Sequence, residues 1–174
     1  MGGSVRRQAV FLGVLLLLSL ALGACSGSAT TSSAEQGEPQ DSLTRVDGGQ
    51  GGVTVQAIWV TPLHLREMAQ DVFGGYPAER YVLIHLKLDT HSVDLLKYDL
   101  PSLVTLQGRN NTYLVPEAWL ALEESDHHRE GIVAFPMTSN EQWAAIEGVA
   151  SLTLREIAGV SERVFTWEFP SAGE

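Results

Sequence analysis

The chain has 174 residues, a formal net charge of −10 and a single cysteine, Cys25. A surface this acidic repels the phosphate backbone of nucleic acid, so we exclude a nucleic-acid partner. One cysteine cannot form an internal disulfide, and the length suits one ordinary domain with additional terminal segments.

Residues 1–24 have the features of a secretory signal peptide. Arg6 and Arg7 give a positive start, and an apolar stretch of about 13 residues follows, shorter than the roughly 20 that a membrane-spanning helix needs. Leu22-Gly23-Ala24-Cys25 resembles the lipobox of bacterial lipoproteins. The resemblance implies cleavage before Cys25, acylation of Cys25 with diacylglycerol and palmitate-like chains, and extracytoplasmic anchoring to the bacterial membrane. The alternative is a secreted protein with a free Cys25 thiol.

Residues 25–52 combine this cysteine with Ser, Thr, Gly, Gln and Glu and almost no large apolar side chain. Such a composition buries too little surface to offset chain ordering, so it predicts a disordered polar linker. Residues 53–170 are apolar and aromatic throughout and are expected to form one domain, followed by a tail at 171–174.

The domain is dominated by short strand-like segments. The clearest is 80–90, in which Val82, Ile84, Leu86 and Leu88 fall on one face and are expected to be core. Further strands are expected at 53–60, 103–107, 112–115, 131–136, 150–157 and 164–169. The Gly-Arg-Asn-Asn sequence at 108–111 is typical of a hairpin turn.

Two short helices interrupt the strand pattern. Thr61-Pro62 predicts an N-cap and a first helical residue before 63–71. Thr138–Glu141 offers a capping box before a helix at 142–147, which Gly148 is placed to end. Residues 116–124 fit either a helical turn or a loop. About seven strands with one or two short helices indicate an all-β, two-sheet sandwich.

Four segments carry a family resemblance: Tyr81–Leu88, Tyr98–Leu100, Leu103–Gly108 and Gly131–Pro136. Together they resemble the immunoglobulin-like, telokin-like domains of uncharacterised bacterial lipoproteins. The resemblance implies an immunoglobulin-like β-sandwich tethered to a membrane by a lipidated cysteine and a polar linker. It does not specify a function.

Candidate metal ligands lie after the strand at 80–90 and before the strand at 131–136. If these strands are antiparallel, the end of one and the start of the other share an edge of the sandwich. Imidazole and carboxylate groups suit Zn or Cu, and an aspartate here is either a ligand or the acceptor that orients a ligand imidazole. The predicted set is His91, His127, His128, Asp89 and Asp94.

Other residues are expected to be structural. His85 lies too far from His91 along an extended strand to share an ion, so we expect it at the surface. His64 is expected to be an exposed helix residue, and the four tryptophans are expected in the core or at its rim. The sequence has no nucleophile elbow and no nucleotide-binding glycine loop, so we do not expect an enzyme.

These observations predict a membrane-anchored extracytoplasmic lipoprotein that acts as a non-enzymatic binding module. In one version it binds a Zn or Cu ion at the sandwich edge. The alternative is a metal-free module that binds a protein of the cell envelope through a sheet edge or a loop face.

Overall fold

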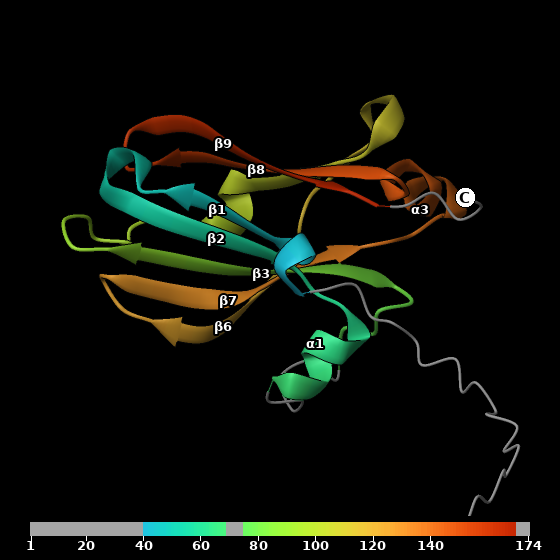
Figure 1. The fold of residues 1–174 in the computed structure, drawn as a ribbon, viewed down its shortest axis with the longest axis horizontal. Helices are drawn as coiled ribbons and strands as arrows, with labels where there is room; N and C mark the ends of the chain where they lie inside the picture. Colours follow the sequence, from blue (N-terminus) through green and yellow to red (C-terminus); the bar gives the residue numbers. More distant parts are fainter. Residues whose placement is uncertain (1–39, 69–74, 170–174) are drawn as a thin grey trace, which may run out of the picture. The chain divides into compact units, whose positions relative to one another are not determined.

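The computed structural model describes residues 40–68 and 75–169 (Figure 1). The predicted signal peptide, Cys25, the linker up to residue 39 and the tail at 171–174 lie outside the described residues. Within the described ranges the chain forms nine strands in two antiparallel sheets, with three short α-helices and several 3-10 turns.

The first sheet has the strand order β1-β2-β3-β7-β6, with bounds Thr44–Gly48, Val53–Trp59, Tyr81–Thr90, His128–Pro136 and Ala118–Glu124. The second sheet has the order β5-β4-β8-β9, with bounds Tyr113–Leu114, Val104–Gln107, Val149–Ile157 and Val160–Glu168. The helices are α1 (Pro62–Glu67), α2 (Leu100–Leu103) and α3 (Asn140–Ile146).

The strand order is that of an immunoglobulin domain. β2-β3-β7-β6 corresponds to the A-B-E-D sheet of that fold, and β9-β8-β4 corresponds to the G-F-C sheet. β1 adds a strand outside β2, and β5 lies beside β4. The prediction of an all-β, immunoglobulin-like sandwich is therefore confirmed, with nine strands in place of about seven.

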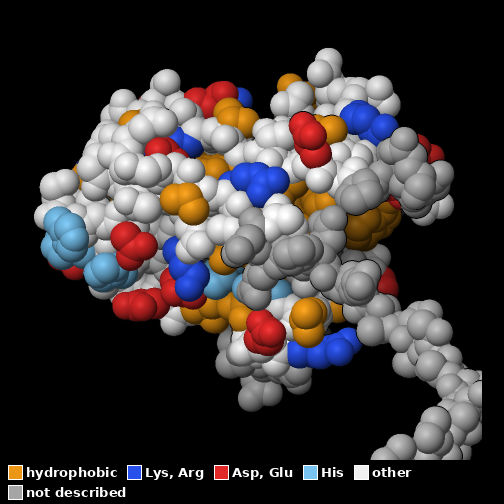
Figure 2. All heavy atoms as spheres, in the orientation of Figure 1, with side chains coloured by type: hydrophobic (Ala, Val, Ile, Leu, Met, Phe, Trp, Pro, Cys, Tyr) orange, Lys and Arg blue, Asp and Glu red, His pale blue; other side chains and the backbone are white. Residues whose placement is uncertain are grey.

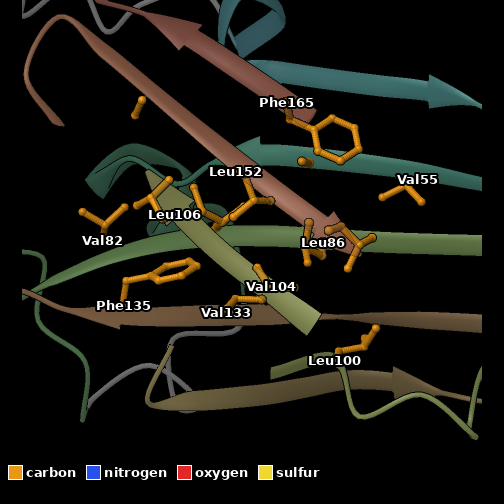
Figure 3. Close-up of a cluster of buried hydrophobic side chains, with 14 of the residues drawn as sticks. Val55, Val82, Leu86, Leu100, Val104, Leu106, Val133, Phe135, Leu152 and Phe165 are labelled. Carbon is orange, nitrogen blue, oxygen red and sulfur yellow. The ribbon is translucent and has the colours of Figure 1, made fainter. Parts of the chain in front are cut away.

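The core lies between the two sheets and is built from alternate residues of each strand (Figure 3). Val82, Ile84, Leu86 and Leu88 of β3 are all 4% exposed or less, as their alternation predicts. The largest fully buried side chain is that of Trp167 in β9. Each of the four tryptophans is buried or packed against this core, which confirms the expectation for them.

The outer face of the first sheet is also covered. α1 begins after Thr61, whose Oγ1 accepts a hydrogen bond from the backbone N–H of His64 at 3.2 Å, as the predicted N-cap requires. Leu65 and Met68 then pack on a second apolar cluster, formed by Val60, Leu83, Ile132 and Ala134. α1 ends at Glu67, before the predicted end at residue 71, because Met68 has extended backbone angles (φ −88°, ψ 157°); residues 69–71 lie outside the described residues.

The other predicted turn and helix signals are also found. α3 begins at Asn140, two residues before the predicted start at 142, and its N-cap is Ser139: Oγ of Ser139 accepts from the Gln142 N–H at 3.3 Å. Gly148, with φ +83°, follows the end of α3. Asn110 and Asn111 adopt φ values of 57° and 56° in the turn between β4 and β5, as the hairpin prediction requires. The four-residue helix α2 was not predicted.

The prediction that the linker extends to Gly52 is wrong, because residues 44–48 form β1 and pair with β2. The segment is polar and lacks an apolar alternation, so its sequence does not indicate a strand. Contacts with distant residues order it instead. The indole N–H of Trp167 donates to the carbonyl of Leu43 at 2.7 Å, and Nε of Arg163 lies 2.6 Å from Oδ2 of Asp47.

The segment 116–124, left open between a helical turn and a loop, contains the edge strand β6. Its register with β7 shifts between Ala121 and Glu123, which marks a β-bulge. A bulge breaks the period-2 pattern of a strand, and the sequence therefore shows no clear periodicity here.

Candidate functional site

The predicted edge site is partly assembled. Asp89 at the end of β3 is directly opposite His128 at the start of β7, as expected for antiparallel strands. Oδ1 of Asp89 lies 2.5 Å from Nδ1 of His128, and the Thr90 N–H donates to the carbonyl of His127 at 3.0 Å. Figure 2 shows histidine side chains beside acidic ones at this edge.

The remaining predicted ligands have other surroundings. His91 is exposed just after β3, and Oδ1 of Asp94 accepts from the Leu96 N–H at 2.9 Å, within its own turn. Nε2 of His127 lies 3.8 Å from a carboxylate oxygen of the adjacent Asp126. In the described part of the chain, no three His, Cys, Asp or Glu side chains are grouped so that they could hold a metal ion. Of the five predicted ligands, the structure pairs Asp89 with His128.

A second group of titratable side chains lies on the same outer face, nearer to α1. Nε2 of His64 in α1 is 3.3 Å from Nδ1 of His85 in β3. Nε2 of His85 is 2.8 Å from Oε1 of Glu130 in β7, and the same oxygen lies 3.0 Å from Nζ of Lys87. These four side chains form the two-histidine cluster.

Two sequence-based expectations are wrong at this cluster. His85 is 3% exposed rather than a surface residue, because α1 packs over this part of β3. His64 is half-buried rather than exposed, because its ring faces that of His85. The nearly continuous apolar run at 81–86 is the signal that indicates cover on both faces of the strand.

Burial controls the protonation states in the two-histidine cluster. Burial lowers the pKa of His85 to about 4, although the Glu130 carboxylate acts in the opposite direction. Burial also lowers the pKa of His64, against the charge of Glu67. For Glu130, burial raises the pKa, but hydrogen bonding and charge from Lys87 and His85 outweigh it and the pKa is lowered. Both imidazoles are therefore neutral near pH 7, while Glu130 is ionised.

These protonation states define the direction of the hydrogen bonds. Because the ionised Glu130 can only accept, Nε2 of His85 carries the proton and donates to it. Nδ1 of His85 then keeps its lone pair, which faces Nε2 of His64. The buried imidazole is thus held in one tautomer and one orientation.

A cavity of about 240 Å³ adjoins both groups of residues. Its lining includes Lys87 and Glu130 of the two-histidine cluster, the Asp89–His128 pair, and Glu123 of β6. The outer face of the first sheet therefore concentrates histidine and carboxylate side chains next to a small polar hollow.

The outer face of the second sheet has the opposite character. Its outward residues alternate with the buried ones on all four strands and are uncharged across the centre of the sheet. Tyr113 is 57% exposed and Val164 is 54% exposed, while the charged pair Arg155–Glu162 lies towards one end and Glu168 lies at the other. This uncharged face consists of Thr105, Gln107, Tyr113, Ser151, Val164 and Thr166, around the buried Thr153.

The fold and these surfaces define an immunoglobulin-like β-sandwich with a covered, titratable outer face on one sheet and an uncharged outer face on the other. Models of known protein families, curated proteins and solved structures gave no match to the chain. None of the helices in the described ranges has the length and apolar character needed to cross a membrane.

Proposed function

We propose that this chain is a lipid-anchored extracytoplasmic binding module that holds a protein of the cell envelope, and that it is not an enzyme. Cys25 would carry the lipid and the residues after it would tether the sandwich. The observation that carries the proposal is the uncharged face, which occupies the centre of a whole sheet in a chain of net charge −10.

The composition of this face suits a protein interface. The cores of such interfaces are depleted in charged residues and enriched in tyrosine. Tyr113 supplies an exposed aromatic ring, and Val164 supplies exposed apolar surface two strands beyond β4. The hydroxyl groups of Ser151 and Thr166, 2.9 Å apart, offer hydrogen bonds to a partner without adding charge.

The test is photo-crosslinking in cells with a photoreactive phenylalanine in place of Tyr113. We expect a discrete crosslinked species that disappears when Val164→Glu is added. The control places the same probe at Leu63, which is 53% exposed on α1, over the outer face of the other sheet. Crosslinks from Leu63 but none from Tyr113 would refute this choice of face.

The lipid anchor has its own test. Metabolic labelling with an alkyne analogue of palmitate should mark the wild-type chain and leave a Cys25→Ser variant unlabelled and released from the membrane fraction. A labelled Cys25→Ser chain, or an unlabelled wild-type chain, would contradict the anchor.

Metal capture at the sandwich edge is a second candidate function, and the Asp89–His128 contact favours it. A carboxylate that accepts from one ring nitrogen of a histidine commonly orients the other nitrogen towards a metal. Nδ1 of His128 faces Asp89, so Nε2 would be the ligand atom, with His91, His127 or Asp94 completing the set. Calorimetric titration with Zn(II) and Cu(II) should show metal binding by the wild-type chain. A triple variant with His91→Ala, His127→Ala and His128→Ala should lose this binding, and unchanged binding in the variant would exclude this site.

A further inference from the structure

The contact between His64 and His85 is a hydrogen bond between two ring nitrogens that face each other. Nε2 of His64 and Nδ1 of His85 are 3.3 Å apart, and the ring centroids are 5.6 Å apart. Because Nε2 of His85 donates to the ionised Glu130, Nδ1 of His85 can only accept, so Nε2 of His64 is the donor. This bond joins α1 to the outer face of β3 at a point where His85 is buried.

Acid can break this hydrogen bond at a single atom. Nε2 of His85 already carries a proton, so a second proton on that ring must go to Nδ1, the acceptor of the bond from His64. Protonation of His85 therefore leaves two N–H groups facing each other. A proton added to His64 goes instead to its Nδ1 and leaves Nε2 as a donor. The bond thus tolerates a charged His64 but not a charged His85.

The surroundings of His85 give little support to a second positive charge. The residues directly opposite it on β2 and β7 are Ile58 and Ile132, which are uncharged. The Glu130 carboxylate favours a charged His85, but Lys87 shares that carboxylate and opposes the charge, and burial outweighs both and lowers the pKa of His85 to about 4. The charged groups that act on the two rings come from three elements: Glu67 of α1, Lys87 of β3 and Glu130 of β7.

We propose that α1 is an acid-released cover of the first sheet: protonation of His85 at Nδ1 breaks its bond to His64, and α1 separates from the sheet. Separation removes Leu65 and Met68 from the second apolar cluster and exposes its buried residues, among them Leu83 and Ile132. Among the described residues, the core between the two sheets includes none from α1, so the sandwich stays folded. The device does not depend on the proposed partner binding.

The test is amide hydrogen exchange of the full chain at pH 7 and pH 4, with each rate corrected for the intrinsic effect of pH. Because the pKa of His85 is about 4 under α1 and returns to about 6.5 once exposed, the open population should rise about a hundredfold between these two pH values. The amides of Leu65 and Met68, which donate to the Thr61 and His64 carbonyls, should lose protection by that factor. The amides of β8 and β9 should keep theirs.

Glutamine variants separate protonation of His85 from general acid effects. His85→Gln keeps a donor and an acceptor but takes up no proton, so the protection of α1 should be the same at both pH values. His64→Gln should behave likewise, because its amide oxygen can accept from a protonated His85. The control, His128→Gln, changes a residue that contacts Asp89 and should respond as the wild type does. Unchanged protection of α1 in the wild type, loss of that protection in His85→Gln, or simultaneous loss in β8 and β9 would overturn the proposal.

Discussion

Residues 40–52 belong to the folded sandwich, and their removal is expected to unfold it. The comparison is between a chain that begins at Gln36 and one that begins at Val53, the start of β2. The longer chain keeps β1 and its contacts with β9. The shorter chain corresponds to the domain boundary that the sequence alone suggests.

Two buried groups determine the magnitude. Without Leu43, the indole N–H of the fully buried Trp167 loses its acceptor at 2.7 Å, which costs about 1–3 kcal/mol. Without Asp47, the Arg163 guanidinium, whose side chain is 1% exposed, loses its ion pair, which costs about 3–5 kcal/mol. Arg163 also loses the Gln50 carbonyl at 2.6 Å. The combined loss of roughly 4–8 kcal/mol approaches the whole stability of an ordinary domain, about 5–15 kcal/mol.

Urea denaturation followed by tryptophan fluorescence measures this loss. The chain from Gln36 should unfold cooperatively, and the chain from Val53 should be unfolded or close to its midpoint without urea. Asp47→Asn in the longer chain separates the ion pair from the loss of β1 and should cost about 3 kcal/mol. Its control, Glu162→Gln, removes an exposed pair with Arg155 and should cost less than about 1 kcal/mol. Equal urea midpoints for the two chain lengths would refute the reasoning.

Three further results are expected. The pKa of His85 is about 4 in the folded chain and about 6.5 in the unfolded chain, so the unfolded chain binds more protons between these pH values. The contribution of His85 to the free energy of unfolding is therefore complete above pH 6.5 and falls by up to about 3 kcal/mol towards pH 4. Urea titrations in the presence of chelator should show this fall, and a smaller fall in the His85→Gln variant. Gly131→Ala places a Cβ 2.6 Å from a backbone oxygen of β6 and should lower the free energy of unfolding by about 1–3 kcal/mol or more. Its control, Gly48→Ala, adds a Cβ with no atom within 4 Å and should leave the free energy of unfolding unchanged. Equal melting temperatures for the two variants would contradict the close packing at Gly131. Glu124→Gln weakens a charged hydrogen bond of 2.6 Å to the buried Arg129 and should lower the melting temperature, and an unchanged value would show that the bond contributes nothing.

The sequence predicts the parts of this fold that depend on local patterns. β3 was predictable because its alternation places four apolar residues on one face, and α1 because a threonine and a proline mark its start. β1 was not predictable in this way. Its order depends on Arg163 and Trp167, which are more than 100 positions away in the sequence, so no window of neighbouring residues contains the information.

The site residues show the same limit. The approach of Asp89 to His128 could be expected, because it follows from the antiparallel pairing of two recognisable strands. The approach of His64 to His85 could not, because it depends on how α1 folds back over the sheet. A strand pattern shows which residues share a face, but it does not identify the element that covers that face.

The two outer faces of the sandwich also make the proposals separable. The Asp89–His128 pair lies on the outer face of the first sheet, and the uncharged face lies on the outer face of the second, with the apolar core between them. Two ligands influence each other only if each has a different affinity for two states of the protein. A close-packed core gives no such second state by itself, so Val164→Glu should abolish partner crosslinking without changing zinc affinity at the sandwich edge, and His128→Ala should do the reverse.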